Sequence, residues 1–496
     1  MTEQNQNSPD YISLAYQQMA PAWALIEDVS GGQDAIKSQQ RVYLPQEPAE
    51  KDEMYQRRLQ RSLWCDHFNP TVEALTGMIF NKSPQLGDDV PQAIKSDLEN
   101  IDLSGTHWAV FAQEVADAAL RFGHTFIVVD YPQALPENAT AADERAAGRR
   151  PFWLHYLPQQ AINWRIQNVQ GQQALTRITF RETILEPFGE FGEQEITQWR
   201  VWYLNEAGRA AWQLFRATTG LDHTTAILDA GSGVTSLRRL PVVPVYGHKK
   251  GFLLSAPPLK PLADLNVTHY QSESDQRNIL HVTRVPILAI IGTEIEELTV
   301  GANSIQNLPE PGSDMKWVEH SGASIGAGRQ DVLDLEARML QFGLGMLAPD
   351  GARSQVTATQ SLIEGTAQTS KLTRLARSLH DGLEAALSLH AEYRSLAQGG
   401  SISFSDNYLG LTLDPALLAQ LVQMVRDDQL PVQTVWQIML KFGQLPDDFD
   451  PEQALALILE NKKKLSAAMP VQPAAPVGGP LPARRDALPP APTPAA

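Results

Sequence analysis

Apolar residues in the first 130 positions recur at three- and four-residue steps, the spacing that places them on one face of a helix. The Asn69–Pro70 step interrupts this pattern and predicts a boundary between two helices there. Gly123 ends the last helix, and the short apolar run after it is typical of a buried strand. The pattern thus predicts helices over residues 9–29, 51–79 and 97–122, followed by a strand over residues 125–130.

From residue 151 to about residue 245 the pattern changes to short runs rich in β-branched and aromatic residues. Glycines separate these runs, as they do between the strands of hairpins. The segment therefore predicts an antiparallel β subdomain. Its expected strands include residues 153–156, 175–180, 197–203 and 211–215, with Gly171, Gly189, Gly192, Gly208 and Gly220 between them.

Helical spacing returns at Pro257–Pro258 and dominates the rest of the chain. A strand-bearing excursion separates two long helices, and a loop over residues 348–355 leads to a third with a leucine stripe. After Gly399–Gly400 the pattern predicts a short strand and two or three helices. The expected elements are helices 257–283, 331–347 and 356–397, strands 286–291, 315–319 and 401–404, and helices 415–427, 432–442 and 451–465.

Composition excludes several classes of protein. No run of 18 or more apolar residues occurs, so no bilayer-spanning helix is expected. Residues 1–9 are polar and lack the order of a secretory signal. Cys65 is the single cysteine, which excludes an intrachain disulfide and disfavours a cysteine-based zinc site. Residues 469–496 are rich in proline and alanine and are expected to be disordered.

The net charge of −17 argues against a protein that grips DNA phosphates, since tight binding needs many lysine and arginine contacts. The charge is compatible with a wall past which DNA slides, because weak or repulsive surfaces do not trap a polyanion. An ordinary acidic, soluble surface also explains the net charge and is the favoured interpretation from charge alone.

Motifs of catalysis are missing. The glycine-rich run Gly322–Gly328 lacks the Lys-Ser/Thr of a phosphate loop and is predicted to be a flexible turn. His380 and His390 are ten residues apart, which is not metal-ligand spacing, so both are expected to be ordinary helix-face residues. No nucleophile elbow or Cys–His signature is present. We therefore expect no enzyme, no cofactor and no metal.

Two charged clusters remain. The acidic group Asp447, Asp448 and Asp450 lies between two predicted helices and is best explained by capping and solvation. Basic residues gather near the 348–355 loop of an otherwise acidic chain. A solvated helix face explains them, and the alternative is contact with DNA phosphates or with a neighbouring subunit. These residues are Arg353, Lys371, Arg374 and Arg377.

Three local patterns resemble the portal proteins of tailed bacteriophages. The first is YQRRL at 55–59 with TVEALTGMIFNKSP at 71–84, and the second is PPLKPLADLNVTHYQSESDQ at 257–276 with the segment to residue 288. The third joins VEHSG at 318–322, LEARM at 335–339 and TAT at 357–359. None is a catalytic signature. Their order and spacing, spread over most of the chain, carry the resemblance.

The resemblance implies an α+β, mainly helical portal fold with a β-rich wing, a two-helix stem, a small α/β clip and a helical crown. The implied wing is residues 1–256, helical at first and β-rich over 151–250. Stem helices 257–284 and 328–347 flank the clip, 285–327. A tunnel loop, 348–356, leads to a long helix, 357–400, that returns to the wing. The crown is 401–468, before the tail 469–496.

The resemblance further implies a dodecameric ring at the capsid vertex, the channel for DNA packaging and ejection. Implied partners are other copies of the chain, the major capsid protein, the terminase motor, a head–tail adaptor and passing double-stranded DNA, with no membrane. The implied place is the virion, after assembly in the host cytoplasm. Arg353, Ser354 and Gln355 would face DNA, and Lys371, Arg374 and Arg377 would contact phosphates or a neighbouring subunit.

Two alternatives stay open. One is a different virion structural protein, such as a minor capsid or neck component, and the long paired helices around a small excursion favour the portal over it. The other is a phage-encoded hydrolase or nuclease, against which the missing catalytic constellation counts.

Overall fold

The computed structural model describes residues 5–132, 140, 148–169, 171–219, 225–283, 287–292, 311–318, 323–343, 358–404, 415–427, 429–441, 445 and 449–468. Within these ranges the chain has an α+β fold with antiparallel sheets. It divides into two compact units, Met1–Gly410 and Leu411–Ala496. The proposed tunnel loop and the proline-rich tail lie outside the described residues.

The first unit begins with helices α1 (Leu14–Ser30), α2 (Gly32–Ser38), η1 (Gln40–Val42), α3 (Asp52–Arg61) and α4 (Phe68–Ile79). Ser13 caps α1, because its Oγ accepts a hydrogen bond from the Tyr16 amide. The helix boundary predicted at Asn69–Pro70 is wrong, since the break spans residues 62–67. Pro70 lies in the first turn of α4, where a missing N–H costs no helical hydrogen bond.

The single helix predicted over residues 97–122 is two helices, α5 (Gln92–Leu98) and α6 (Trp108–Phe122). The intervening turn is held by Asp102, whose Oδ1 accepts hydrogen bonds from the amides of Ser104 and Thr106. Such local bonds compete with helix formation. Gly123 ends α6 as predicted, with a positive φ of 89°. A Cβ there would lie 2.5 Å from the Ala256 carbonyl oxygen, so only glycine fits.

The antiparallel β subdomain is confirmed and consists of two sheets. The predicted strand at residues 125–130 is β2 (His124–Asp130), fully buried at the centre of a sheet between β3 (Phe152–Tyr156) and β9 (Val242–Tyr246). The larger sheet is a five-stranded meander in chain order. It contains β4 (Ala161–Val169), β5 (Gln172–Phe188), β6 (Gly192–Leu204), β7 (Ala210–Thr219) and β8 (Thr225–Val234).

Shorter elements complete the unit. They are η2 (Pro158–Gln160), the pair β10 (Lys249–Gly251) and β11 (Leu254–Ser255), and the pair β1 (Gln85–Leu86) and β14 (Ile402–Ser403). Strand β14 confirms the short strand predicted near residues 401–404. Its partner β1 lies more than 300 residues earlier, and no local pattern indicates that pairing.

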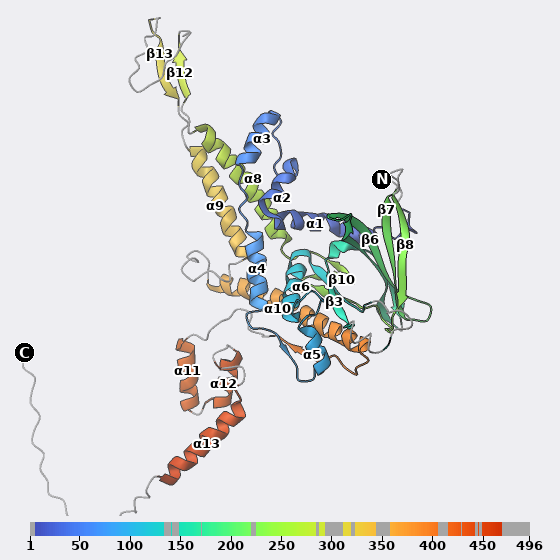
Figure 1. Ribbon diagram of the computed structural model, residues 1–496. Helices are drawn as coiled ribbons and strands as arrows, with labels where there is room; N and C mark the ends of the chain where they lie inside the picture. Colours follow the sequence, from blue (N-terminus) through green and yellow to red (C-terminus); the bar gives the residue numbers. More distant parts are fainter. Residues whose placement is uncertain are drawn as a thin grey trace, which may run out of the picture. The chain divides into compact units, whose positions relative to one another are not determined.

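The hydrophobic core of the first unit gathers α1, α4, α6, the three-stranded sheet and helix α10 (Ala358–Tyr393). The predicted leucine stripe of α10 is confirmed as its buried face, which packs on β9, β2 and α6 (Figure 1). Gly382 allows this close approach, because a Cβ there would lie 2.6 Å from Val245 Cγ2. The buried stripe consists of Leu372, Leu375, Leu379, Leu383 and Leu387.

Two long helices and a strand pair follow one another as predicted. They are α8 (Lys260–Thr283), β12 (Ile287–Ile291), β13 (Asp314–Val318) and α9 (Ala323–Gly343). The flexible turn predicted at Gly322–Gly328 is wrong, since residues 323–328 form the first turns of α9. Gly328 sits against α8, where a Cβ would lie 2.3 Å from Gln276 Oε1. The side-chain amide of Gln276 donates through Nε2 to the Ile325 carbonyl at 3.0 Å.

The second unit contains α11 (Pro415–Arg426), α12 (Val432–Lys441) and α13 (Pro451–Ala468), as the pattern predicts. Asp450 caps α13, because its Oδ1 accepts hydrogen bonds from the amides of Glu452 and Gln453. Asp447 and Asp448 lie outside the described residues. No helix in the described part of the chain is long and apolar enough to cross a membrane.

Candidate functional site

The paired helices α8 and α9 carry a two-stranded sheet at one end, so that the chain runs out along α8 and returns along α9 (Figure 1). Val332, Leu335 and Met339 form the buried stripe of α9, at three- and four-residue spacing. Helix α8 is more polar, and Asn266 and His269 are fully buried in it. Buried polar groups need hydrogen-bond partners, and those of α8 define where the helix is anchored.

The segment between α3 and α4 supplies partners for two buried residues of α8, Asn266 and Ser274. The Asn266 side chain donates to the Cys65 carbonyl at 2.8 Å and accepts from the His67 amide at 3.0 Å. Ser62 Oγ donates to Ser274 Oγ at 2.7 Å, within the buried interface. These bonds explain why the chain leaves helical geometry over residues 62–67, since its backbone there is bonded to α8. The base of α8 is therefore rigidly held.

A pair of histidines lies beside these anchors. The rings of His67 and His269 are 5.6 Å apart, and His269 Nε2 is 3.4 Å from Glu336 Oε1 on α9. Burial lowers the pKa of His67, and the neighbouring His269 lowers it further. No group of three or more His, Cys, Asp or Glu in the described ranges could hold a metal ion. The cluster joins α4, α8 and α9 by electrostatic contacts.

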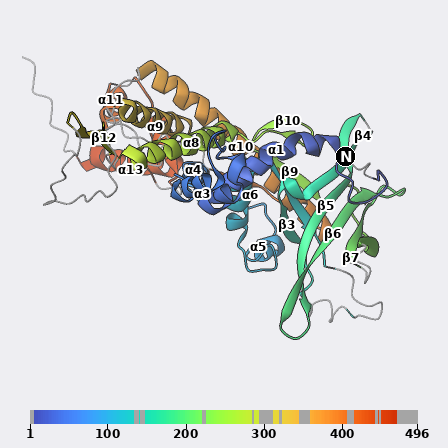
Figure 2. The same cartoon turned by 90° about the horizontal axis from the view of Figure 1, so that it is seen from above.

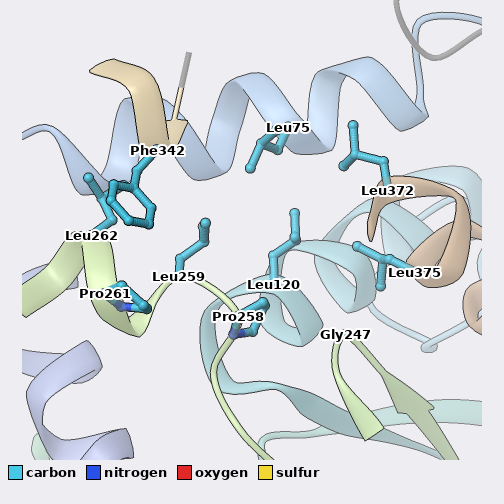
Figure 3. A pocket seen from close by; sticks show the side chains of 10 residues that line it. All are labelled: Leu75, Leu120, Gly247, Pro258, Leu259, Pro261, Leu262, Phe342, Leu372 and Leu375. Atoms are coloured by element: carbon cyan, nitrogen blue, oxygen red, sulfur yellow. The ribbon is translucent and has the colours of Figure 1, made fainter. Parts of the chain in front are cut away.

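An apolar pocket lies where the helix pair meets the body of the first unit (Figure 3). Its volume is about 90 Å³. Its lining side chains are apolar, so it offers no acid, base or nucleophile. The arrangement can bury hydrocarbon between the helices and the body, but it has no groups for catalysis. The lining residues are Leu75, Leu120, Gly247, Pro258, Leu259, Pro261, Leu262, Phe342, Leu372 and Leu375.

Strands β12 and β13 form an antiparallel ladder from Ile287 opposite Val318 to Ile291 opposite Asp314. Only these two strands make up the sheet among the described residues, and Ile291 is 46% exposed. An isolated two-stranded sheet is marginally stable in water, so it gains from packing against a partner. The end of the helix pair thus presents a small sheet suited to contact with other molecules.

The structure describes only some of the basic residues identified in the sequence. Arg353, Ser354 and Gln355 lie outside the described residues, and Lys371 lies in α10 in a part whose side chains are not described. Arg374 and Arg377 are exposed on α10 and line a groove of about 530 Å³.

The groove also contains residues that sequence reasoning did not connect with Arg374 and Arg377. His248 from the β9–β10 connection and Lys249 from β10 bring further nitrogen groups, and Asp381 adds one carboxylate. Val243, Pro244 and Ala385 supply apolar lining. Because α10 and β9 are more than a hundred residues apart in the chain, no local pattern could have indicated this grouping. The groove is mixed in character, basic at its rim with apolar lining.

The two histidines of α10 differ. His380 is partly exposed and lies 3.2 Å from Asp381, as expected for a helix-face residue. The same expectation is wrong for His390, which is fully buried and bonded through Nε2 to Asp97 Oδ2 at 2.8 Å. Arg394 makes two further bonds to that carboxylate, at 2.6 and 2.7 Å. Burial lowers the pKa of His390, although the hydrogen bond to Asp97 opposes this.

Comparison with known proteins gives matches of two kinds. Residues 258–394 match the model of a domain of unknown function, DUF4055, a range that contains α8, the strand pair, α9 and α10 up to its end. No curated protein sequence matches the chain.

Among solved structures, the chain is similar to one in the virion of a native gene transfer agent (GTA) particle. That likeness has a TM-score of 0.39 and 14% sequence identity, over 76% of this chain and 89% of the other. A chain in the neck of the native GTA particle, computed with C12 symmetry, has a TM-score of 0.34 and 14% identity, over 76% and 90% of the two chains.

Proposed function

We propose that this chain is the portal subunit of a tailed bacteriophage, a ring protein through which DNA enters and leaves the capsid. The observation that carries the proposal is the hairpin of two long helices with a small sheet at its end, followed by the long helix α10. The resemblance in residues 55–84, 257–288 and 318–359 predicts that order of elements. The described residues offer apolar packing and anchoring at this hairpin in place of catalytic groups.

In this proposal α8 and α9 are the stem, the strand pair belongs to the clip, and the preceding helices and sheets with α10 form the wing. Helices α11 to α13 belong to the crown. Exposed apolar side chains on the helix pair support packing by neighbouring subunits, because large apolar groups gain from leaving water. Ile279 on α8 is 37% exposed, and Leu333 and Leu340 on α9 are 40% and 50% exposed.

The stem surface supports a channel that holds DNA weakly. Helix α9 exposes Arg329 and Arg338 at either side of Asp331 and Asp334, so that both signs of charge occur along it. Affinity for a duplex rises with the number of phosphates neutralised, and carboxylates among the arginines keep that number low. A duplex could therefore slide past twelve such helices without being trapped.

The proposed partners follow from the same placement. The exposed strand pair would dock the terminase motor during packaging and a head–tail adaptor afterwards. The major capsid protein would grip the wing and stem at the vertex of the virion. The basic tunnel-loop residues Arg353, Ser354 and Gln355 would face the DNA.

A packaging assay tests the function. Deleting residues 348–356 should leave ring assembly intact and abolish DNA packaging, because the loop would contact DNA while α8 and α9 keep their anchors to α3 and α4. The matched control removes residues 470–496, which should change neither assembly nor packaging. Loss of rings on deleting 348–356, or full packaging without these residues, would refute the placement of the loop in the channel.

A further inference from the structure

Strands β5 and β6 extend beyond the sheet to which they belong. Strand β4 pairs with β5 only as far as Phe180, and β7 pairs with β6 only from Gln198 onward. The β5–β6 ladder continues to Phe188 opposite Gly192. Residues 183–197 therefore form a two-stranded arm that projects from the sheet (Figure 2). At about 3.3 Å per residue, its strands reach roughly 20 Å.

The tip of the arm, residues 188–195, has the sequence FGEFGEQE. Phe188 is 65% exposed and Phe191 is 92% exposed. Glu190, Glu193 and Glu195 are exposed as well, and the tip has no lysine or arginine. The end of the arm therefore carries two phenyl rings and three carboxylates. Because a two-stranded hairpin is marginally stable and exposed aromatic rings gain free energy on burial, this tip is suited to docking in a pocket of another molecule.

The groove on α10 and β9 has the complementary character. Arg374, Arg377 and Lys249 place positive charge at its rim, and Lys249 Nζ lies 4.9 Å from the centroid of the Tyr246 ring. Val243 and Ala385 provide apolar contact. A phenyl ring could pack on the apolar lining while the neighbouring glutamates reach the rim cations.

We propose that the arm tip of one copy docks in the α10–β9 groove of the next copy. The inference rests on the proposed ring, since a head-to-tail contact between two different surfaces of one chain forms a closed cycle where its rotation allows closure. Charge complementarity favours this occupant. The chain carries −17 overall, whereas the groove, with three basic side chains and the one carboxylate of Asp381, is net basic and would face three acidic side chains of the arm. Pro187 lacks an amide hydrogen, which disfavours strand addition along the β5 edge of the arm, and the exposed rings and carboxylates of the tip favour docking through side chains.

Phosphate is the competing ligand for these arginines. Asp381 lies in the groove with an 81% exposed side chain, and its charge repels a phosphate and the glutamates of the arm alike, so it gives a phosphate no advantage. Apolar lining likewise gives a phosphate nothing to contact, whereas a phenyl ring fits it. The groove therefore favours the arm of another copy over DNA.

Charge reversal tests the contact. The variant Glu190→Lys/Glu193→Lys and the variant Arg374→Glu/Arg377→Glu should each raise the concentration for half-assembly at least about tenfold, measured by light scattering. The two double variants, mixed or combined in one chain, should recover most of the wild-type assembly. Glu206→Lys and Arg238→Glu are matched controls, since both residues are exposed and lie outside the arm and the groove.

Cross-linking locates the same contact. In a Cys65→Ser background, Phe191→Cys chains mixed with Ala385→Cys chains should be joined by a short bismaleimide into pairs of unlike copies. If the wild-type chain forms rings, the charge variants assemble as it does and no such cross-link forms, the proposed contact is wrong while the proposed ring stands. Wild-type protein that stays monomeric at every concentration would overturn the ring and the contact together. Groove variants that assemble normally but lose packaging would assign the arginines to DNA instead.

Discussion

Asp97 of α5 accepts hydrogen bonds from His390 and Arg394, residues that lie 293 and 297 positions later in the chain. Burial raises the pKa of Asp97, but the bonds from His390 and Arg394 outweigh burial and the pKa lies below its ordinary value. The Asp97 carboxylate thereby links the end of α10 to α5. Periodicity placed His390 on a helix but could not identify this partner, because no local pattern encodes a contact across so many residues.

Asp97→Asn should lower the free energy of unfolding by about 3 kcal/mol, because it leaves two cationic or polar partners without their carboxylate in a buried site. Urea denaturation at pH 7 measures this loss. Asp381→Asn on α10 is the control, since that side chain is 81% exposed and its change should stay within about 0.5 kcal/mol. Equal effects of the two substitutions would show that the buried bonds add nothing.

His124 gives the fold a dependence on pH. It is 1% exposed and bonded through Nδ1 to Ser255 Oγ at 2.6 Å, and burial lowers its pKa from 6.5 to about 3. Between these pH values the unfolded chain binds the proton that the folded chain excludes. Stability is therefore full above pH 6.5 and falls as the pH drops toward 3, by about 1.4 kcal/mol per pH unit from this residue.

Unfolding by urea at pH 7.5 and pH 5.5 measures that slope. His124→Gln should reduce the difference in unfolding free energy between these two pH values by about 1.4 kcal/mol, whatever its effect on stability at pH 7.5. His281→Gln at the exposed end of α8 should leave the slope as it is. An unchanged slope in His124→Gln would contradict the assignment.

At the scale of elements, apolar periodicity identified α10, its buried stripe and the helix–excursion–helix order. It failed at residues 62–67 and 99–107, where hydrogen bonds from α8 and from Asp102 replace helical ones. The projecting length of β5 and β6 also escaped prediction. Strand propensity predicts that residues 175–180 form a strand. Where β5 and β6 leave the sheet is decided by the lengths of β4 and β7, which propensity does not give.

The packing of α10 on β9 yields a prediction for Gly382, with a glycine of α4 as its control. Gly382→Ala should destabilise the first unit by about 1–3 kcal/mol, because its Cβ would lie 2.6 Å from the buried Val245 side chain. Gly77→Ala is the matched control in α4, where a Cβ meets nothing within 4 Å, and it should stabilise by about 0.5–1 kcal/mol. Thermal unfolding of both variants checks the opposite signs, and a shift in the same direction would contradict this packing.

At the scale of the whole molecule, the described features point outward. The helix pair exposes Leu333 and Leu340, the strand pair lacks a third strand in its described part, and the β5–β6 arm ends in exposed Phe191. In a monomer these apolar groups and strand edges stay in water and add nothing to the stability of the fold. The proposed ring would account for all three, because each would find its partner in a neighbouring copy or in a docked component.

The most direct test is negative-stain electron microscopy of the purified chain together with its light-scattering mass. The proposed function predicts rings with a central hole and the mass of about twelve copies of the 54.7 kDa chain, or about 0.66 MDa. A compact, closed dimer without a channel would contradict the portal assignment.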